Sequence, residues 1–354
     1  MENRQATREL ILKHFEKYPK SEARDLYKFL YQGVFGPGHM IPSRSAAVEY
    51  ALSEFKSCAQ KGATVIEELD GDFCRVSLSC LGDGLSAETL GGLFYLSSKC
   101  DVQDRAAFEK RLNVLGELIS SGLLPFSFTE YQKTIGTLKD MGYPAVHHSE
   151  AFRKNYHPAY RVIHKKFVPL LPFFARIDAL LSKKDTLTLA IDGGCAGGKS
   201  TLAKLLEEVY GATVFHMDDF FLRPEQRTKE RYLEVGGNVD RERFLDEVLT
   251  PLKRGVPPSY RRFDCSTFAL GEKIDVTPGR FCVIEGTYSH HPALVAHYDL
   301  TVFLDVALDV RKRRISVRNS PKMAERFFNE WIPLEEKYFR EMQIKERADI
   351  VLEF

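Results

Sequence analysis

The sequence predicts an α/β protein in two parts, a mostly helical α+β domain followed by a parallel β-sheet flanked by helices. Helical spacing of apolar residues dominates positions 1–165, with one short strand among them. From position 186 onward, short apolar runs rich in β-branched residues alternate with helical patterns. Strands that alternate with helices favour a parallel sheet covered on both faces. The length of 354 residues also favours two domains over one.

The first domain, residues 1–165, is expected to begin with an amphipathic helix. Charged residues alternate there with Leu10, Ile11 and Phe15, unlike the apolar core of a signal peptide. The segment 31–39, rich in glycine and aromatic residues, is expected to be a loop, and Phe73–Ser79 alternates as a strand does. Further helices are expected near residues 26–30, 47–55, 86–98 and 103–120, and after the capping box Ser127-x-x-Glu130.

A connecting segment, residues 166–185, is expected between the two domains. The pattern from Val162 to Leu181 is helical, with a bend or break at Pro172. The polar stretch Ser182–Asp185 then marks the boundary. In the second domain, residues 186–354, strands are expected at 186–191, 213–216, 281–284, 300–304 and 349–352.

Composition argues against several classes of protein. Lys and Arg number 50 against 49 Asp and Glu, a balance that disfavours broad binding to nucleic acid. No run of 18 apolar residues occurs, so no membrane-spanning helix is expected. The seven cysteines are an odd number without a C-x-x-C pair, which favours reduced thiols and a cytoplasmic location.

The strongest motif is Gly193-Gly194-Cys195-Ala196-Gly197-Gly198-Lys199-Ser200, which fits G-x-x-x-x-G-K-[ST]. Glycines at these positions let backbone N–H groups surround a phosphate, and the following helix directs its positive end at the same anion. Lys199 would reach the β- and γ-phosphates, and Ser200 would bind Mg²⁺. A glycine-rich turn that binds nothing is the alternative. The pattern predicts ATP and Mg²⁺ as cofactors, with ATP held by Gly193, Gly194, Cys195, Ala196, Gly197, Gly198, Lys199, Ser200 and Thr201.

Two acidic positions follow predicted strands of the second domain. Asp218, beside Asp219, comes after the second strand and could accept a proton from an attacking hydroxyl group. Glu285, followed by Gly286, comes after the third strand and could supply a further contact to Mg²⁺. The alternatives are a turn-capping aspartate and a solvated acid at a strand end. No N-K-x-D motif of GTPases and no L-S-G-G-Q motif of transporter ATPases is present.

Basic residues cluster between Arg311 and Arg326, where they could neutralise charge on a transferring phosphate. Arg314 and Arg318 are spaced i, i+4 and are expected to share one helix face. Arg311, Lys312 and Arg313 are interpreted as ordinary surface residues.

From about Leu187 to the C-terminus, the chain resembles the uridine kinase and phosphoribulokinase group of P-loop kinases. The order and spacing of several short segments carry this resemblance. They are IDGGCAGGKSTLA at 190–202, DDFF at 218–221, NVDRERF at 238–244, IEGTY at 284–288, DVRKRRISVRN at 309–319 and ADIVL at 348–352.

The resemblance implies a five-stranded parallel core and an arginine-bearing lid. It assigns Asp218 as the base that activates the substrate hydroxyl, Asp240 as a ligand of sugar hydroxyls and Tyr260 as a residue near the base. The metal-binding glutamate corresponds to Glu285, and the lid arginines correspond to Arg314 and Arg318. Asp240 is also a good N-cap for a helix over 241–253.

The sequence departs from pyrimidine nucleoside kinases at three single positions, and the paired arginines of their lid are partly displaced. Cys265 stands where these enzymes have a histidine, Asn319 replaces an aspartate of the lid, and Val239 replaces an aromatic residue. These differences leave the acceptor open, and the Asp-Asp-Phe-Phe form is closer to nicotinamide riboside kinases.

Two functions are therefore considered for the whole chain. The first is an ATP-dependent kinase that phosphorylates a hydroxyl group of a small metabolite, most simply a nucleoside or a related ribosyl compound. The second is an ATP-binding switch whose N-terminal domain engages a protein or RNA partner. An oligomer is compatible with both.

The first domain matches no family of known function. Its segment 147–161 is dense in polar and aromatic residues, which suits a docking strap against the kinase domain or a second ligand site. A metal site formed by His147, His148, Glu150 and His157 is a further alternative. Cys195 is either a neutral small residue of the loop or a redox-active thiol activated by the helix N-terminus.

Overall fold

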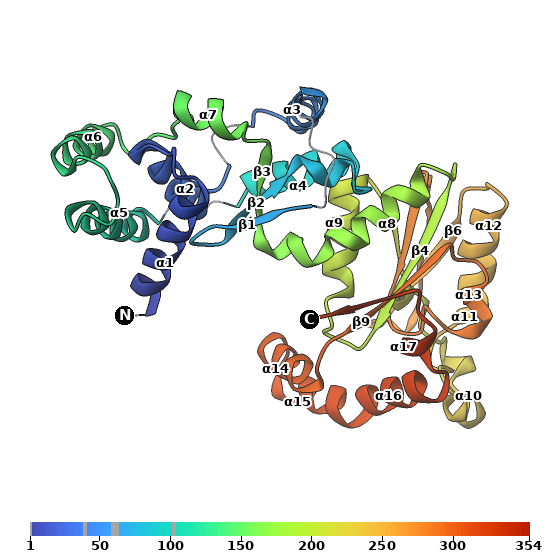
Figure 1. Ribbon diagram of the computed structural model, residues 1–354. Coiled ribbons are helices and arrows are strands. Elements are labelled where there is room, and N and C mark those ends of the chain that lie inside the picture. The colour runs from blue at the N-terminus through green and yellow to red at the C-terminus, as the bar shows by residue number, and fades with distance from the viewer. Residues whose placement is uncertain (1, 38–40, 58–63, 101–103) are drawn as a thin grey trace. The chain divides into compact units, whose positions relative to one another are not determined.

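The chain divides into two compact units, Met1–Ala179 (unit 1) and Leu180–Phe354 (unit 2). The computed structural model describes residues 2–37, 41–57, 64–100 and 104–354 (Figure 1). Residues 38 and 39 of the loop expected at 31–39 lie outside this described part.

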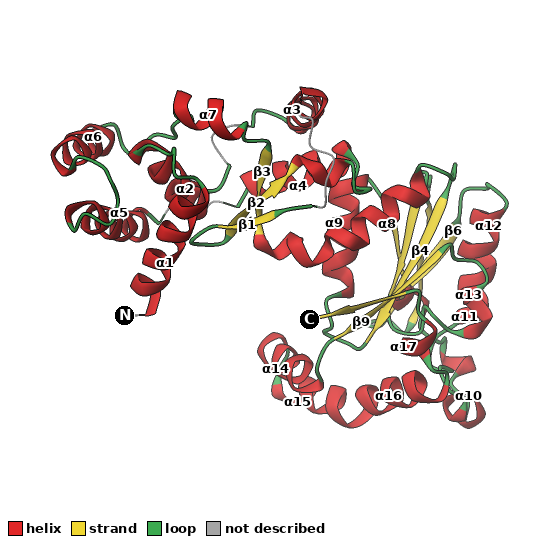
Figure 2. Cartoon of the chain, in the orientation of Figure 1, coloured by secondary structure: helices red, strands yellow, loops and turns green. Residues whose placement is uncertain are grey.

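Unit 2 is built on a five-stranded sheet in the order β10-β9-β4-β8-β5, and every strand pair is parallel. The predicted parallel sheet flanked by helices is confirmed. β4 and β8 are almost completely buried, because helices lie on both sides of the strands (Figure 2). The strands are β4 (Leu187–Gly193), β5 (Thr213–His216), β8 (Phe281–Glu285), β9 (Leu300–Asp305) and β10 (Ile350–Glu353).

Helices and one hairpin connect these strands. α9 is capped by glycines in the left-handed region at both ends, Gly198 and Gly211. The hairpin pairs β6 (Ser259–Asp264) with β7 (Ala269–Asp275). The α-helices of unit 2 are α9 (Lys199–Tyr210), α10 (Lys229–Leu233), α11 (Arg241–Phe244), α12 (Thr250–Lys253), α13 (Pro292–Val295), α14 (Leu308–Arg318), α15 (Pro321–Arg326), α16 (Ile332–Glu341) and α17 (Ile344–Arg347).

The helix expected over 241–253 is present with a π-helical stretch, Leu245–Leu249, between α11 and α12. Its buried face contributes Phe244 and Val248 to a core that also contains Phe215 and Ile284 from the sheet. Fully burying such side chains stabilises the fold by roughly 1.5–3 kcal/mol each. This core includes residues of β5 and β8, and the carboxyl ends of these strands carry the candidate site.

Unit 1 combines helices with a three-stranded antiparallel sheet in the order β1-β2-β3. The strands are β1 (Ile66–Glu68), β2 (Phe73–Ser77) and β3 (Tyr160–His164). The single strand that the sequence predicts is therefore the centre of a small sheet. The α-helices are α1 (Glu2–Lys17), α2 (Ala23–Phe35), α3 (Arg44–Ser57), α4 (Ala87–Ser98), α5 (Arg105–Ser120), α6 (Phe128–Asp140), α7 (Glu150–Tyr156) and α8 (Leu171–Leu181).

Two local predictions for unit 1 are wrong. Residues 31–35 continue α2 instead of forming a loop, and Tyr31 packs against the core with Phe35. Residues 162–164, expected at the start of a helix, belong to β3 instead, because each position of this strand pairs with β2, as Val162 does with Arg75. The bend or break expected at Pro172 corresponds to a change of helix type, because a 3₁₀ helix, Lys165–Leu170, ends there and α8 begins at Leu171. Pro172 occupies the first turn of α8, where its missing N–H is not needed.

α8 is anchored within unit 1 by Asp178. This carboxylate accepts hydrogen bonds from the backbone N–H of Ser86 (2.7 Å) and the hydroxyl of Thr89 (2.8 Å) at the start of α4. The segment that the sequence assigned to a connection thus contributes to the packing of unit 1 as far as Ala179.

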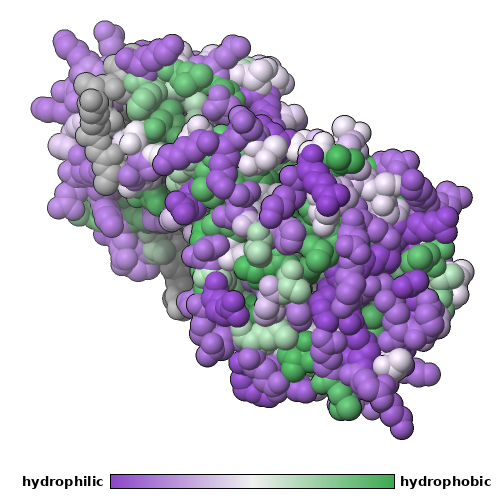
Figure 3. All heavy atoms as spheres, turned by 90° about the vertical axis from the view of Figure 1, so that its right-hand side faces the viewer, coloured by the Kyte–Doolittle hydropathy of each residue, from purple (hydrophilic) through white to green (hydrophobic). Residues whose placement is uncertain are grey.

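Hydrophilic side chains cover most of the face shown in Figure 3, and hydrophobic ones occur there in small groups. Among the residues that the structure describes, no helix is both long and apolar enough to span a bilayer.

Candidate functional site

The phosphate-binding motif forms a tight loop between β4 and α9, and this loop requires glycine. Gly193 has φ +142°, and a Cβ atom there would lie 2.6 Å from the carbonyl oxygen of Leu304. A Cβ atom on Gly197 would lie 2.8 Å from the carbonyl oxygen of Gly194. Gly198 has φ +97° as the N-cap of α9. The loop therefore turns its backbone toward the N-terminus of a helix, an arrangement that suits phosphate.

Lys199 lies at the start of α9 with its ammonium group folded over the loop. Its Nζ atom donates hydrogen bonds to the carbonyl oxygens of Gly193 (2.8 Å) and Gly194 (3.1 Å). A third bond reaches the Oγ1 atom of Thr287 at 3.1 Å. All three donors of the ammonium group thus have protein partners.

Strand register brings Ser200, Glu285 and His216 together. Glu285, the last residue of β8, pairs with Ile191 on one side and with His216 on the other. Its carboxylate accepts a hydrogen bond from the Ser200 hydroxyl (3.2 Å) and contacts Nδ1 of His216 (2.6 Å). The bond to Glu285 raises the pKa of His216. A hydroxyl and a carboxylate side by side offer the oxygen ligands that Mg²⁺ prefers.

Asp218 and Asp219 lie in a short 3₁₀ turn, Met217–Phe220, directly after β5. Partial desolvation raises the pKa of Asp218, and Lys199 opposes this effect while Glu285 adds to it. Asp219 forms an ion pair with Arg262 at 3.1 Å. The two neighbouring carboxylates thus differ, since Asp219 forms an ion pair with an arginine, whereas the charge of Lys199 lowers the pKa of Asp218 against the effect of desolvation.

Tyr260 and Asp240 both form hydrogen bonds to the turn Met217–Phe220, Tyr260 through its hydroxyl and Asp240 through its backbone N–H. The hydroxyl of Tyr260 donates to Asp219 at 3.4 Å, so it contacts the neighbour of the predicted base. Asp240 is 1% exposed and caps α11 by accepting a hydrogen bond from the N–H of Arg243 at 3.2 Å. Its own N–H donates to the carbonyl oxygen of Phe220 at 2.7 Å. The Oδ2 atom of Asp240 has no hydrogen-bond partner among the described residues, although Arg243 and Arg223 lie within 4 Å of it.

The two predicted lid arginines lie on α14. Arg314 donates a hydrogen bond from Nη1 to the carbonyl oxygen of Ala196 in the phosphate loop at 3.1 Å. Arg318 is exposed one turn later. Ile315 between them packs with Ile332 in a small cluster that also contacts Cys195 and Ala196. The helix that carries these arginines therefore rests on the loop.

Arg311 is not an ordinary surface residue, contrary to the sequence interpretation. It is 4% exposed and forms ion pairs with Glu335 (3.3 Å) and Glu336. A Cβ atom on Gly194 would lie 1.7 Å from its Nη1 atom, so the guanidinium group lies against the loop backbone.

Glu335 is a further residue of the site that sequence reasoning missed. Its Oε2 atom accepts a hydrogen bond from the backbone N–H of Cys195 at 2.9 Å, and its Oε1 atom accepts one from Thr287 at 3.4 Å. A carboxylate therefore binds an N–H group of the phosphate loop. The sequence marks Glu335 only as an acidic residue in an apolar stripe, because it lies three residues after Ile332 and three before Tyr338.

Cys195 does not have the environment of an activated thiol. Burial raises its pKa to about 12, and the nearby Glu335 carboxylate adds to this effect. A thiol of this kind is a weak nucleophile at neutral pH.

The histidines of segment 147–161 do not gather into one site. His148 contacts Asp25 (2.9 Å) and Tyr160 (2.6 Å) through its two ring nitrogens, and His157 ends α7 in the left-handed region. His147 is exposed. In the described part of the chain, no group of three or more His, Cys, Asp or Glu side chains could hold a metal ion. The alternative of a metal site at His147, His148, Glu150 and His157 therefore finds no support in the structure.

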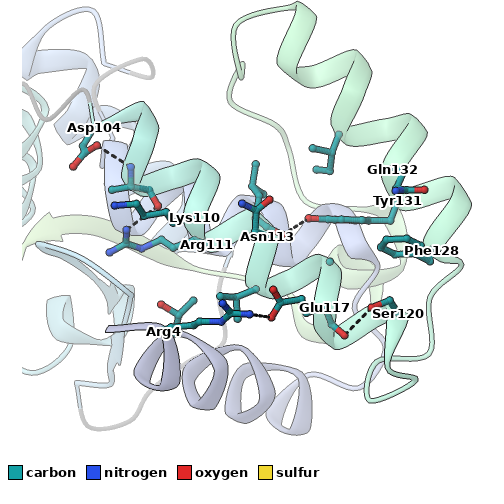
Figure 4. A pocket seen from close by; sticks show the side chains of 16 residues that line it. Arg4, Asp104, Lys110, Arg111, Asn113, Glu117, Ser120, Phe128, Tyr131 and Gln132 are labelled. Atoms are coloured by element: carbon teal, nitrogen blue, oxygen red, sulfur yellow. Dashed lines mark hydrogen bonds and ion pairs between the residues drawn. The ribbon is translucent and has the colours of Figure 1, made fainter. Parts of the chain in front are cut away.

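Unit 1 also contains a hollow of about 1000 Å³ beside α5 and α6 (Figure 4). Many of its polar groups are engaged within the protein. Arg4 pairs with Glu117, Asp104 caps α5, and the Tyr131 hydroxyl donates to the carbonyl oxygen of Leu112 at 2.7 Å (Figure 4).

Comparisons with known proteins agree with the motifs of unit 2. No family model matches the chain. The uridine kinase of Shewanella piezotolerans is 27% identical over 144 residues, which cover 37% of this chain and 67% of that protein. The uridine kinase of Shewanella halifaxensis is 29% identical over 146 residues, with the same coverage.

Among solved structures, a possible uridine kinase from Bacillus stearothermophilus aligns with 51% of this chain and 99% of its own. The identity is 22% and the TM-score is 0.39. The two Shewanella uridine kinases confirm the resemblance of the C-terminal half of this chain to uridine kinases, which the motifs had indicated.

Proposed function

We propose that the protein is an ATP-dependent phosphotransferase that phosphorylates a hydroxyl group of a small metabolite, a nucleoside or a related ribosyl compound. One observation carries the proposal. The carboxyl ends of three adjacent parallel strands bring the phosphate loop with Lys199, the Ser200–Glu285 pair and the carboxylate of Asp218 to one place. Ligand sites of open α/β sheets form at these strand ends.

The residues of the loop bind and orient the triphosphate. Backbone N–H groups of 193–201 and the ammonium group of Lys199 hold the phosphates, and Lys199 exchanges its bonds to Gly193 and Gly194 for phosphate oxygens. Ser200 and Glu285 are the residues that would hold Mg²⁺, which offsets charge on the phosphates when bound. His216 must then release the carboxylate of Glu285 in part.

Asp218 orients the acceptor hydroxyl and accepts its proton. It is the carboxylate of the 217–220 turn that faces Lys199 without an arginine partner, whereas Asp219 is neutralised by Arg262. Asp240 and Tyr260 flank the same turn, where Asp240 would contact sugar hydroxyls of the acceptor and Tyr260 would lie near the base. Arg314 and Arg318 stabilise charge on the transferring phosphate when the lid closes.

The proposal is tested by measuring ADP release by the full-length protein with Mg-ATP and a panel of acceptors. The panel contains uridine, cytidine, adenosine, nicotinamide riboside and free ribose, and mass spectrometry identifies the phosphorylated product. We expect one class of acceptor to be phosphorylated, and the Lys199→Ala variant to lose this activity. ATP binding without any phosphorylated product across the panel would favour a nucleotide-dependent switch instead.

A further inference from the structure

A second cavity of unit 1, with a volume of about 570 Å³, lies among α2, α3, α4, α7 and β3. Cavities of this size hold small organic ligands. Its walls include the polar or charged residues Lys28, Gln32, Arg153, His148, Tyr160 and Arg161. Four of these residues are less than 9% exposed, namely Lys28, Gln32, His148 and Arg161. Polar side chains are thus buried at positions that apolar side chains usually occupy.

The cavity wall carries more positive than negative charge. Lys28, Arg153 and Arg161 are cationic side chains, and Glu54 is the acidic residue among those that line the cavity. Glu54 pairs with Arg161 at 2.6 Å, and its side chain is 51% exposed. The ammonium group of Lys28 has a carbonyl partner, Val146, at 2.8 Å. This excess of cations favours an anionic ligand.

Arg161 has hydrogen-bonding capacity that the described residues do not use. Its Nη1 atom donates to Glu54 and to the carbonyl oxygen of Tyr160 (2.9 Å). Its Nε and Nη2 atoms are buried and have no hydrogen-bond partner among the described residues. These two atoms form the edge of a guanidinium group that binds carboxylate or phosphate in a bidentate manner. Buried donors without partners are costly, and both atoms have less than 1 Å² of exposed surface, so an anion pairs with this edge once the surrounding side chains shift to admit it.

A buried chain of hydrogen bonds fixes the polarity of Tyr160. Burial disfavours the ionised form of Asp25, but hydrogen bonds from His148 and Ser149 hold the pKa of this carboxyl at about 2. The ionised Asp25 therefore accepts a hydrogen bond from Nδ1–H of His148, and Nε2 of His148 accepts one from the Tyr160 hydroxyl. This hydroxyl is 2.6 Å from Nε2 and 3.4 Å from Oε1 of Gln32, so the histidine is the preferred acceptor. A ligand group that reaches the phenolic oxygen meets an acceptor and must donate a hydrogen bond.

We propose that this cavity is a second ligand site, which binds a small organic anion that also carries a hydroxyl or N–H group. A carboxylate or phosphate group would contact the cationic side chains, and the donor group of the same molecule would contact Tyr160. Hydroxy acids and sugar phosphates both have this chemistry. Every residue of the argument lies in unit 1, so the site does not depend on the function proposed for unit 2.

The test uses isothermal titration calorimetry on the full-length protein carrying Lys199→Ala, which weakens phosphate binding by the loop of unit 2. The probes are malate, succinate, ribose 5-phosphate and neutral ribose. We expect ribose 5-phosphate or malate to bind at one site per chain, and ribose to give no binding. Binding of the phosphate ester alone or of the hydroxy acid alone would identify the anionic group.

Two substitutions locate the binding. Arg153→Ala removes an exposed cation of the cavity wall, and we expect at least fivefold weaker binding. Lys154→Ala, the matched control on the same helix, changes a residue outside the cavity lining and should alter affinity less than twofold. Tyr160→Phe should reduce the preference for malate over succinate, because it removes the acceptor for the malate hydroxyl.

Three results would overturn the proposal. They are no binding of any anion at millimolar concentration, equal binding of ribose, and equal effects of Arg153→Ala and Lys154→Ala. Arg153 and Lys154 are both exposed, so comparing Arg153→Ala with Lys154→Ala tests the site even where Tyr160→Phe fails to fold.

Discussion

Glu335 puts a negative charge on the part of the loop that would receive a phosphate group. Its carboxylate accepts the N–H of Cys195 and lies beside Arg311, and both side chains are about 95% buried. Burial raises the pKa of Glu335, and Lys199 opposes this effect. A bound triphosphate would add further negative charge here, so Glu335 and ATP compete for the same donors.

We predict that Glu335→Gln strengthens ATP binding. Removing one negative charge close to the phosphates should improve the affinity roughly tenfold, or by about 1.4 kcal/mol. Glu336→Gln is the matched control, because Glu336 pairs with the same Arg311 but has a half-exposed side chain. Its effect on affinity should stay within twofold. Calorimetric titration with ATP measures both variants, and weaker binding by Glu335→Gln would show that this carboxylate supports the loop instead.

His148 makes the stability of unit 1 depend on pH. Burial lowers its pKa to about 4 from 6.5, against the effect of Asp25, and Arg75 and Lys28 lower it further. Between pH 6.5 and 4 the unfolded chain binds a proton that the folded chain does not. The free energy of unfolding therefore falls as the pH falls through this window, by about 3 kcal/mol for this group.

We predict that His148→Gln flattens this profile. Urea unfolding of the full-length protein at pH 7, 5.5 and 4 should show a smaller loss of stability than in the wild type. The exposed neighbour provides the control, since His147→Gln should leave the slope unchanged. An unaltered pH dependence in His148→Gln would refute the assignment of this histidine as buried and neutral.

The positions of the site residues could be predicted where a motif specifies them. Lys199, Ser200, Asp218 and Glu285 all lie at the carboxyl ends of the strands, as their places after apolar runs indicate. Arg311 and Glu335 escaped prediction because a buried ion pair between distant helices has no short motif. Each shows in the sequence only as a charge within an apolar helical stripe.

At the scale of elements, the strands of unit 2 were predictable and two of unit 1 were not. A parallel strand buried on both faces reads as a continuous apolar run, as β8 does. β1 has three residues and an exposed face, so it leaves no run to detect. β3 mixes Tyr160, Arg161 and His164 with two β-branched residues, and pairing with β2 decides its conformation.

The helix α14 is the element that we expect to act as the lid. Arg314→Ala and Arg318→Ala should each reduce kcat roughly 10²–10³-fold with a smaller effect on ATP affinity, because they act on charge in the transition state. Arg313→Ala is the matched control on the same helix and should reduce kcat less than threefold. Steady-state kinetics with Mg-ATP and the acceptor from the panel compares them. Equal losses in all three variants would indicate a general electrostatic effect.

At the scale of the whole molecule, two units carry separate groups of buried charged residues. The net charge of +1 conceals this organisation, since 49 acidic residues balance 50 basic ones over the whole chain. In unit 2 the cations gather at the phosphate loop and α14, and in unit 1 they line the 570 Å³ cavity. Under the two proposals, the chain binds one anion in each unit.

In the proposed reaction, Asp218 accepts the proton of a hydroxyl group while the loop holds ATP. The most direct measurement is transfer of the labelled γ-phosphate of ATP to the acceptor by the wild type and by Asp218→Asn, with ATP affinity measured on the same preparations. We predict at least a 10²-fold lower rate of transfer in the variant, with ATP affinity within threefold of the wild type. Transfer by Asp218→Asn at the wild-type rate would contradict the account.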